Sequence, residues 1–392
     1  MPVKKTYDII IAGAGAAGLS LVWYLMQSDI MKDKSILLLD RSLQPAKDKT
    51  WCFWEDKNLP REDFFHHSWK QLEVIVHGNT FTEELQHYSY RCMRSVNFTT
   101  TILERAANHP SVDLVEADVN HFDSYDDLGI VHTSEGTFRA EWIFQSALKP
   151  PEFYDQKVDI SLKQHFLGIE IETQNPIFDP DKVTLMDFDT SQKHGLTFFY
   201  VLPFSKTKAL VEYTFFTENI LSNKEYRAGI DAHLLERYSL EKSDYTISRE
   251  EKGSIPMEDR HYPAWYNPRV MNIGTVGGLT KPSTGYTFTR IHRHCASIVN
   301  ALEKGNTPPT SNKSAYRFRV YDMMLLNIIH EDPIEGVRIF RELFKKNSFD
   351  KILRFLEEDT TFNEELSIFA SVPYMPFFKS IYKMKHRIFT GA

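Results

Sequence analysis

The hydrophobic pattern at the start of the chain predicts a strand, a turn, a helix and a second strand. Residues 7–12 form a short β-branched apolar run, which is typical of a buried parallel strand. Apolar residues then recur at helical spacing over 19–26, and 35–39 form a second apolar run. No charge occurs from Ile9 to Ser28, so hydropathy alone suggests a signal peptide or a membrane span. The alternation of run types favours a βαβ unit instead, and we expect no transmembrane helix anywhere in the chain.

Three glycines in the pattern Gly-x-Gly-x-x-Gly separate the first strand from the helix. In a dinucleotide-binding fold, the first glycine permits the turn, the second admits the pyrophosphate and the third lets the helix pack on the strand. The helix N-terminus adds free N–H groups and the positive end of its dipole. Asp40 ends the second strand, where it would accept hydrogen bonds from ribose hydroxyls. This context favours dinucleotide binding over an ordinary glycine-rich turn, with contacts from Gly13, Ala14, Gly15, Ala17, Gly18, Asp40 and Arg41.

The remaining pattern alternates between strands and helices and becomes helical after about residue 284. A helix is predicted over 96–108, and a hairpin joins strands at 196–202 and 209–216. Further strands are predicted at 72–77, 112–117, 129–132, 137–144 and 164–173. We expect a discontinuous dinucleotide-binding domain (1–160 and 269–310), a mainly β-sheet substrate domain (161–268) and a helical region (311–392) that is the candidate for membrane contact.

A second glycine cluster follows the strand-like residues 269–272 and precedes the late helices. A glycine turn that feeds a helix N-terminus is what a flavoprotein needs to complete an FAD site. The alternative interpretation is an ordinary strand-to-helix turn. On the first interpretation, the cofactor contacts include Gly277, Gly278, Thr284, Gly285 and Tyr286.

Composition excludes several classes of protein. The 46 Lys and Arg against 53 Asp and Glu give a formal charge of −7, which disfavours nucleic-acid binding because phosphate contacts need concentrated positive charge. Three widely spaced cysteines exclude a disulfide framework and favour a reducing, cytoplasmic compartment. The histidines at 66, 67, 292 and 294 lack partner ligands at metal-binding spacing, so we expect no metal site. The aromatic excess, 28 Phe, 18 Tyr and 6 Trp, needs a separate explanation.

Ordered strings along most of the chain resemble the bacterial lycopene β-cyclases, which are flavoproteins. The resemblance implies an α/β fold, namely an FAD-binding Rossmann-type fold with an interleaved β-sheet substrate domain and a helical C-terminal part. It also places Trp51 at the cofactor. The matching strings lie at 13–18, 50–54, 164–170, 185–187, 199–205, 210–214, 249–257 and 277–286.

What the resemblance implies is a non-redox reaction run on a redox cofactor. FAD would be reduced by NADPH or NADH, and the reduced form would be active. Lycopene would be protonated at its end, closed through a carbocation to a six-membered ring and deprotonated, giving γ-carotene and then β-carotene. The alternatives are a redox flavoenzyme of the same fold (a monooxygenase or prenyl reductase) and a non-catalytic FAD- or lipid-binding protein.

Glu212 is the predicted proton donor. Protonation of an alkene needs a carboxylic acid that stays neutral in an apolar place, and Glu212 lies in the aromatic strand 210–216. The strand pattern alone favours a solvent-facing Glu212, whereas the resemblance assigns it the donor role. The family often carries a second acid directly afterwards, where this chain has Tyr213. The final base is therefore left open between Glu212 itself, water and another group.

Three further segments bear on the hypothesis. Residues 142–148 lack the Asp and Gly that related flavoproteins commonly show at that strand end, and residues 355–359 are interpreted as a solvated helix end. After Glu365 no acidic residue occurs, and basic residues alternate with aromatics. That pattern fits an interfacial helix or an ordinary terminal helix equally. A bilayer-dissolved carotenoid favours peripheral association with the inner membrane, while the oligomeric state stays open.

Overall fold

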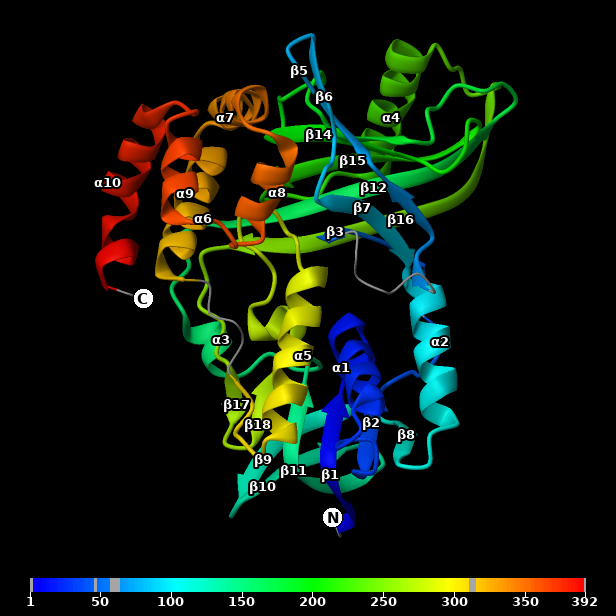
Figure 1. Ribbon diagram of the computed structural model, residues 1–392, viewed down its shortest axis with the longest axis vertical. Helices are drawn as coiled ribbons and strands as arrows, with labels where there is room; N and C mark the ends of the chain where they lie inside the picture. Colours follow the sequence, from blue (N-terminus) through cyan, green and yellow to red (C-terminus); the bar gives the residue numbers. More distant parts are fainter. Residues whose placement is uncertain (1–2, 46–47, 57–63, 310–314, 391–392) are drawn as a thin grey trace.

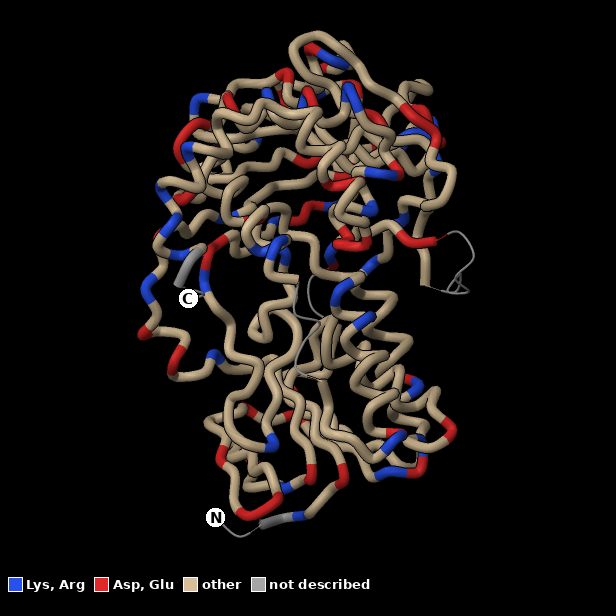
Figure 2. Tube along the Cα trace, turned by 60° about the vertical axis from the view of Figure 1, so that its left-hand side comes forward, with Lys and Arg blue, Asp and Glu red and all other residues tan. Residues whose placement is uncertain are grey.

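Two large sheets occupy opposite ends of an elongated molecule, with the C-terminal helices beside the second sheet (Figure 1). The computed structural model describes residues 3–45, 48–56, 64–309 and 315–390. Lys and Arg are interspersed with Asp and Glu over both ends (Figure 2). None of the described helices combines the length and the apolarity that crossing a bilayer requires.

The first sheet has eight strands, and its parallel centre carries the glycine-rich turns. The strand order is β17-β18-β11-β1-β2-β8, and the β9–β10 hairpin joins β11. Helices α1, α2 and α5 contribute to a core with one face of this sheet, because their buried stripes carry Leu, Ile, Val and Phe. The strands are β1 (Val3–Ala12), β2 (Ile36–Asp40), β8 (Val112–Glu116), β9 (Val119–Tyr125), β10 (Leu128–Thr133), β11 (Gly136–Gln145), β17 (Trp265–Asn267) and β18 (Val270–Asn272).

The second sheet has seven strands in the order β16-β12-β15-β14-β13-β5-β6. It is antiparallel except where β13 runs parallel to β5. A small sheet, β3-β7-β4, connects the two halves of the molecule. The strands are β5 (Gln71–Val76), β6 (Asn79–Glu84), β12 (Ser161–Thr173), β13 (Lys182–Asp187), β14 (Leu196–Pro203), β15 (Lys208–Thr217), β16 (Tyr245–Glu258), β3 (Thr50–Asp56), β4 (His67–Trp69) and β7 (Tyr88–Arg94).

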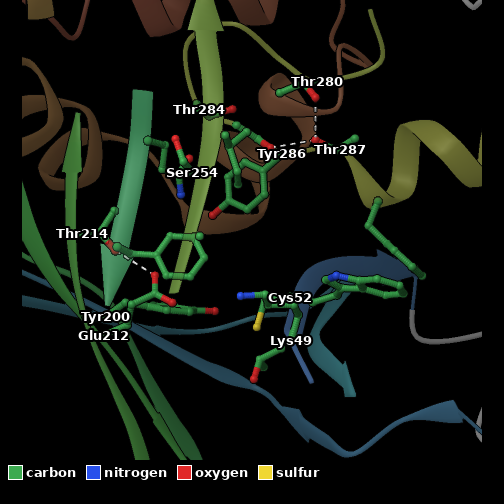
Figure 3. Close-up of a pocket in the computed structure, with 18 of the residues that line it drawn as sticks. Lys49, Cys52, Tyr200, Glu212, Thr214, Ser254, Thr280, Thr284, Tyr286 and Thr287 are labelled. Carbon is green, nitrogen blue, oxygen red and sulfur yellow. Dashed lines mark hydrogen bonds between the residues drawn. The ribbon is translucent and has the colours of Figure 1, made fainter. Parts of the chain in front are cut away.

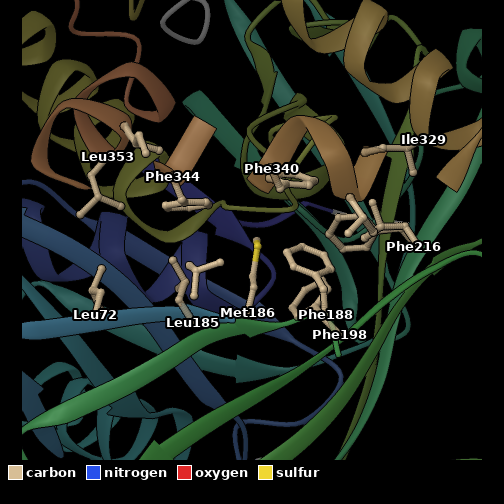
Figure 4. Close-up of a cluster of buried hydrophobic side chains, with 14 of the residues drawn as sticks. Leu72, Leu185, Met186, Phe188, Phe198, Phe216, Ile329, Phe340, Phe344 and Leu353 are labelled. Atoms are coloured by element: carbon tan, nitrogen blue, oxygen red, sulfur yellow. The ribbon is translucent and has the colours of Figure 1, made fainter. Parts of the chain in front are cut away.

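Helices cover the second sheet on both faces. On one face α4 packs its buried residues against β12 and β15. On the other face, apolar side chains of α6, α7 and α8 meet those of β5, β13, β14 and β15, and the ring of Phe340 stacks on Phe188, which directly follows β13 (Figure 4). The helices are α1 (Ala16–Gln27), α2 (Ser95–Ala107), α3 (Glu152–Asp155), α4 (Asn223–Tyr238), α5 (Phe288–Glu303), α6 (Tyr316–Glu331), α7 (Pro333–Lys346), α8 (Phe349–Leu356), α9 (Phe362–Phe369) and α10 (Tyr374–Thr390).

The predicted elements are confirmed to within a few residues, including the opening βαβ unit and the β14–β15 hairpin. The pattern did not predict the strands of the small sheet, nor β13, β16 and α4. Strands β5 and β6, which precede residue 160, pair into the seven-stranded sheet. The chain therefore enters that sheet, leaves it and returns, because strand pairing depends on contacts between distant segments that no local pattern specifies.

Candidate active site

A cavity of about 450 Å³ lies between the glycine-rich end of the first sheet and one face of the second. Figure 3 shows side chains of the second sheet, of β3 and of the loop before α5 around the space between Glu212, Tyr200 and Tyr286. The cavity is lined mostly by apolar and aromatic groups. The lining residues include Ala16, Lys49, Thr50, Trp51, Tyr90, Gln164, Phe166, Phe198, Tyr200, Glu212, Thr214, Phe216, Glu251, Thr284, Gly285, Tyr286 and Phe288.

The first glycine turn leaves backbone groups open at the N-terminus of α1. Gly13 has a φ of +114°, which a residue with a side chain rarely adopts, and a Cβ on Gly18 would lie 1.8 Å from the Gly13 carbonyl oxygen. A Cβ on Gly15, by contrast, would meet no atom within 4 Å. The first turn of α1 carries no acidic residue and no side-chain cap, so its free N–H groups are available to an anion. This geometry suits a dinucleotide pyrophosphate.

The second glycine turn packs on the first. A Cβ on Gly274 would lie 2.9 Å from the Cβ of Ala17, and Gly278 has a φ of +74°. A Cβ on Gly277 would come 2.5 Å from the carbonyl oxygen of Asn272. The structure therefore joins two clusters that are about 260 residues apart in sequence. The sequence had led us to expect that the second cluster completes the cofactor site, because it follows a strand and precedes a helix.

The segment before α5 borders the cavity directly. Gly285 has a φ of +73°, and a Cβ there would lie 2.1 Å from Oε1 of Gln164. The Oγ1 of Thr284 and the Oε1 of Gln164 are buried, and no described residue hydrogen-bonds to either. Buried polar atoms normally have a partner, so these two mark a place where a polar ligand fits.

Asp40, which is predicted to bind the ribose, already accepts hydrogen bonds within the protein. The Ala14 N–H donates to Oδ2 of Asp40 over 2.6 Å, and the Ser42 N–H donates to Oδ1 over 3.2 Å. Asp40 therefore fixes the first glycine turn, and the half-buried carboxylate retains acceptor capacity for a ribose hydroxyl. The adjacent Arg41 is exposed.

The strand end that departs from related flavoproteins, residues 142–148, is organised by one buried amide. The side-chain oxygen of Gln145 accepts from the N–H groups of Ala147 and Leu148, while its nitrogen donates to the Leu148 carbonyl and to Asn272. The Oγ of Ser146 approaches Gly13 so closely that a Cβ there would lie 2.3 Å away. These polar contacts hold the first glycine turn against the end of β11.

Aromatic rings line and surround the cavity between the glycine turns and the second sheet. The centroid of the Trp51 ring lies 5.7 Å from the ring centroid of Phe98 and 5.8 Å from that of Phe288. The Tyr286 ring meets Trp54 edge-to-face at 4.5 Å. Burial raises the pKa of the Tyr286 hydroxyl, so this group is neutral. The rings give the cavity an apolar surface with few competing charges.

Glu212 lies on the cavity face of β15, and its side chain is only 8% exposed. Alternation along the strand places Leu210, Glu212 and Thr214 on this face. Thr214 donates a hydrogen bond of 2.8 Å to Oε1 of Glu212, as Figure 3 shows. The solvent-facing alternative for Glu212 is therefore wrong, because both faces of this sheet are covered.

The environment of Glu212 keeps its carboxyl group neutral. Burial is the largest cause, and the charge of Glu251 adds to it, raising the pKa of Glu212 to about 8. The Thr214 hydrogen bond and the cations Lys49 and Arg249 oppose this rise. At neutral pH the group is a carboxylic acid that can donate a proton.

A second carboxylate, that of Glu251, also lines the cavity. It is 3% exposed and belongs to β16. Its Oε2 accepts from Nη1 of Arg249 at 2.6 Å and from the N–H and Oγ1 of Thr50 at 2.8 and 3.1 Å. Glu251 lies in the matching string at 249–257, but the sequence alone suggested no role for it. The alternation of Arg249, Glu251 and Gly253 along a strand is the signal that places them on one face.

Tyr213 faces away from the cavity. Its ring stacks on Phe199 at 4.2 Å between centroids, in the cluster under α4. Successive side chains of a strand point to opposite faces, so an acid directly after Glu212 would also point under α4. The absence of an acid at this position therefore removes nothing from the cavity.

The end of α8 is not solvated, so that part of the interpretation of residues 355–359 is wrong. Glu357 is paired with Arg293 at 2.8 Å, and burial raises its pKa. Glu358 is paired with Lys281 and Arg290 at 3.1 and 2.8 Å. These ion pairs fasten the end of α8 to α5 and to the loop before it, because buried carboxylates require charged partners. Neither glutamate lines the cavity.

Within the described residues, His121, Asp123 and His132 place ligand atoms within 4.8 Å of one another on β9 and β10. His121 and Asp123 are exposed, and none of the three lines the cavity. The Nε2 of His132 lies 2.9 Å from Oδ2 of Asp123, and in the tautomer that carries a proton on Nε2 it donates to this carboxylate.

Comparison with known proteins identifies relatives over most of the chain. The family model described as lycopene cyclase protein matches residues 8–382. A lycopene β-cyclase of Pantoea ananas is 26% identical over 73% of this chain and 72% of its own length. A lycopene β-cyclase of a Paracoccus species is 23% identical over 81% of this chain and 78% of its own length. A chloroplastic neoxanthin synthase of Solanum lycopersicum is 26% identical over 77% of this chain and 61% of its own length.

Solved structures share the fold at low sequence identity. A geranylgeranyl bacteriochlorophyll reductase-like protein of Thermoplasma acidophilum has a TM-score of 0.60 and 14% identity, over 97% of this chain and 99% of its own. A flavoprotein/dehydrogenase of Cytophaga hutchinsonii has a TM-score of 0.58 and 12% identity, over 98% of this chain and 99% of its own. The resemblance in sequence is confirmed by the family model, and the predicted fold class by these structures. The chain belongs to the lycopene cyclase family.

Proposed function

We propose that this protein is an FAD-dependent lycopene β-cyclase that closes the linear ends of the carotenoid without net redox change. The observation that carries the proposal is Glu212, a buried acid with a pKa of about 8 that faces an apolar cavity shared with two glycine turns. Protonation of an alkene needs a donor that still carries its proton at neutral pH in a water-poor place, and the burial and raised pKa of Glu212 support that role. The substrate class rests on family membership and on the named relatives.

The glycine turns fit the FAD that the family implies. The open backbone at Gly15 and the N-terminus of α1 would hold the pyrophosphate, and Asp40 the ribose. The partnerless atoms of Thr284 and Gln164 would face the polar edge of the ring system. Reduced by NADPH or NADH, the cofactor would supply negative charge beside a substrate cation.

The residues of the second sheet would carry out the proton transfer. Glu212 would deliver its proton to C2 of the carotenoid end, leaving positive charge at C1 that the C5=C6 double bond attacks. Rings such as Phe166, Phe198 and Tyr200 would face the cation with their electron-rich surfaces, and they contain no group that adds to it readily. They would also exclude the water that would otherwise capture the cation.

The decisive experiment measures rings formed against nicotinamide consumed. Purified protein is incubated with lycopene, FAD and NADPH, and products are separated by chromatography. A cyclase forms many rings for each nicotinamide oxidised, whereas a monooxygenase or prenyl reductase consumes one for each product. Equal stoichiometry rejects the cyclase, and unchanged lycopene with bound flavin leaves a non-catalytic binding protein.

The role of Glu212 is tested by Glu212→Gln, which keeps shape but removes the acidic proton. We expect ring formation to fall by about 10²–10⁴-fold, the range for loss of a general acid, while bound flavin is unchanged. Glu250→Gln is the matched control, because Glu250 pairs with Ile169 on the opposite face and forms an ion pair with Arg227. Turnover by Glu212→Gln at the wild-type rate would remove Glu212 from the mechanism.

We also propose that α10 contacts a membrane surface. Its exposed side chains include Phe378 at 61%, Tyr382 at 72% and Tyr374 at 67%, beside the exposed Lys379 and Lys385. Aromatics with lysines favour the interface of an anionic bilayer, where the substrate dissolves. Membrane contact would associate the enzyme peripherally with the inner membrane.

Sedimentation with vesicles containing anionic lipid tests this surface. Replacing Phe378 and Tyr382 together by Ser should reduce the bound fraction at least about fivefold, since each ring loses its apolar transfer energy. The control is Tyr125→Ser, because Tyr125 is 67% exposed on β9 of the first sheet. Equal binding of the double variant and the control would reject α10 as the contact.

A further inference from the structure

Two carboxylates face each other across a single glycine on the cavity face of the second sheet. Gly168 of β12 pairs with Glu212 on β15 and with Glu251 on β16. A Cβ on Gly168 would lie 3.5 Å from the Cβ of Glu212 and 3.3 Å from the Cγ of Glu251. No side chain therefore separates the two acids, and both line the same cavity.

The surroundings of the two carboxylates differ. Glu212 receives one hydrogen bond, from the neutral hydroxyl of Thr214. Glu251 receives three on its Oε2, one of them from the guanidinium of Arg249. Its Oε1 receives none from any described residue, so one oxygen of this cavity-lining carboxylate has no hydrogen-bond donor among them. The guanidinium of Arg249 gives Glu251 a cationic hydrogen-bond donor that Glu212 lacks, so Glu251 is the member of the pair suited to accept a proton.

Building on the proposed cyclase activity, we propose that Glu251 is the base that removes the last proton. Glu212 gives its proton to C2, and attack of the C5=C6 electrons on C1 forms the ring and leaves the charge at C5. Oε1 of Glu251 then accepts the proton from C6, and the C6–H electron pair becomes the C5=C6 double bond. One proton is added and one is lost, and transfer from Glu251 back to Glu212 resets the pair.

The other charged groups of the cavity do not offer this chemistry. Among the described residues that line it, the carboxylates are Glu212 and Glu251, and the cation is Lys49. A proton next to a carbocation is strongly acidic, so a carboxylate stabilised by Arg249 is basic enough to accept it. A base fixed on the same face as the acid also determines which neighbouring carbon loses its proton, and hence which ring isomer forms.

Product analysis of Glu251→Gln holoenzyme tests the assignment. Wild-type protein and the variant are loaded with FAD, and flavin content and melting temperature are recorded to establish that both are folded. They are then supplied with lycopene and NADPH from pH 6 to 9. We expect β-ring formation to fall at least about 100-fold at every pH, the range for loss of a general base. The residual rings should carry the double bond at C4–C5 or outside the ring, because the cation loses a proton elsewhere.

Two variants separate this role from a structural one. Glu251→Asp keeps a carboxylate, so it should retain the β-ring as its main product at a reduced rate. Glu170→Gln removes another buried carboxylate that binds Arg249, at 3.2 Å, but that does not line the cavity. Its product should be the wild-type β-ring, whatever its stability.

Three results would overturn the assignment of Glu251. They are β-ring formation by Glu251→Gln within about threefold of wild type, recovery of its activity at low pH, and the same product change in Glu170→Gln. Recovery at low pH would mean that Glu251 only raises the pKa of Glu212. Absence of ring formation by the wild-type protein would instead overturn the proposed function, and this assignment with it.

Discussion

The two walls of the cavity are made from different parts of the polypeptide. The wall on the side of the first sheet is the backbone next to the two glycine turns, where Ala16 of the first turn and Thr275 of the second line the cavity and neither turn contributes a charged side chain. The wall of the second sheet consists of side chains, namely aromatic rings and the Glu212–Glu251 pair. A backbone wall binds by shape and by fixed N–H groups, whereas a side-chain wall determines where protons go.

This difference determines how each wall responds to substitution. A Cβ added at Gly13 or Gly18 would collide with neighbouring atoms, so binding and folding should fail together there, whereas Gly15 has room for one. An isosteric change in the other wall leaves the fold in place and alters the charge alone.

The largest effect is expected from Gly18→Ala. The added Cβ would lie 1.8 Å from the Gly13 carbonyl oxygen, so the turn must deform. We expect flavin retention to be lost and the free energy of unfolding to fall by about 3 kcal/mol, the upper range for overpacking. Chemical unfolding and flavin absorbance measure both. Gly15→Ala is the control, because its Cβ meets nothing within 4 Å and should weaken flavin binding with little change in stability; equal unfolding energies for the two variants would contradict this view of the wall.

An intermediate effect is expected from pH. The proposed donor is the neutral form of Glu212, whose pKa is raised to about 8 by burial and by Glu251. The rate should be level below this pKa and fall about tenfold for each pH unit above it. Because the folded pKa exceeds the unfolded value, the folded state binds more protons between the two. The stability of wild type relative to Glu212→Gln should therefore fall as pH rises from about 4.5 to 8.

Rate profiles and denaturant titrations across pH 4–9 measure these two dependences. The control is Glu170, whose pKa is lowered to about 2 despite burial, because Lys208, Arg94 and Arg249 stabilise its charge. The ionised Glu170 carboxylate should therefore contribute to folding stability above about pH 4.5, and this contribution should be lost as the pH falls towards 2. If the stability of wild type relative to Glu212→Gln rises with pH instead of falling, the assigned protonation of Glu212 is wrong.

The smallest effect is expected from Gly168→Ala, which introduces one methyl group between the acids. That methyl would lie 3.1 Å from Leu210 and 3.3 Å from Glu251, so the neighbours must shift by tenths of an ångström. We expect ring formation to fall by about tenfold, since small displacements of catalytic groups cost rate. Stability should change by less than about 1.5 kcal/mol. Steady-state product formation measures the rate, and an unchanged rate would show that the spacing of the acids has no importance.

The sequence predicted the backbone wall better than the side-chain wall. The glycines at 13, 15 and 18 are local in sequence, and the turn that they form follows from their lack of a Cβ. Glu212 was located by resemblance, since its strand pattern favoured solvent exposure. Glu251 was missed because its proximity to Glu212 depends on the pairing of β12 with both β15 and β16.

The sequence by itself determined the βαβ start, the two glycine clusters, the β14–β15 hairpin and the family, because short-range periodicity and ordered motifs encode them. Tertiary structure alone decided that β5 and β6 join the second sheet, that Tyr213 faces α4 and that Glu212 and Glu251 meet across Gly168. The physical reason is that strand pairing and burial arise between distant segments. The protonation of an acid depends on those neighbours rather than on the residues beside it in sequence.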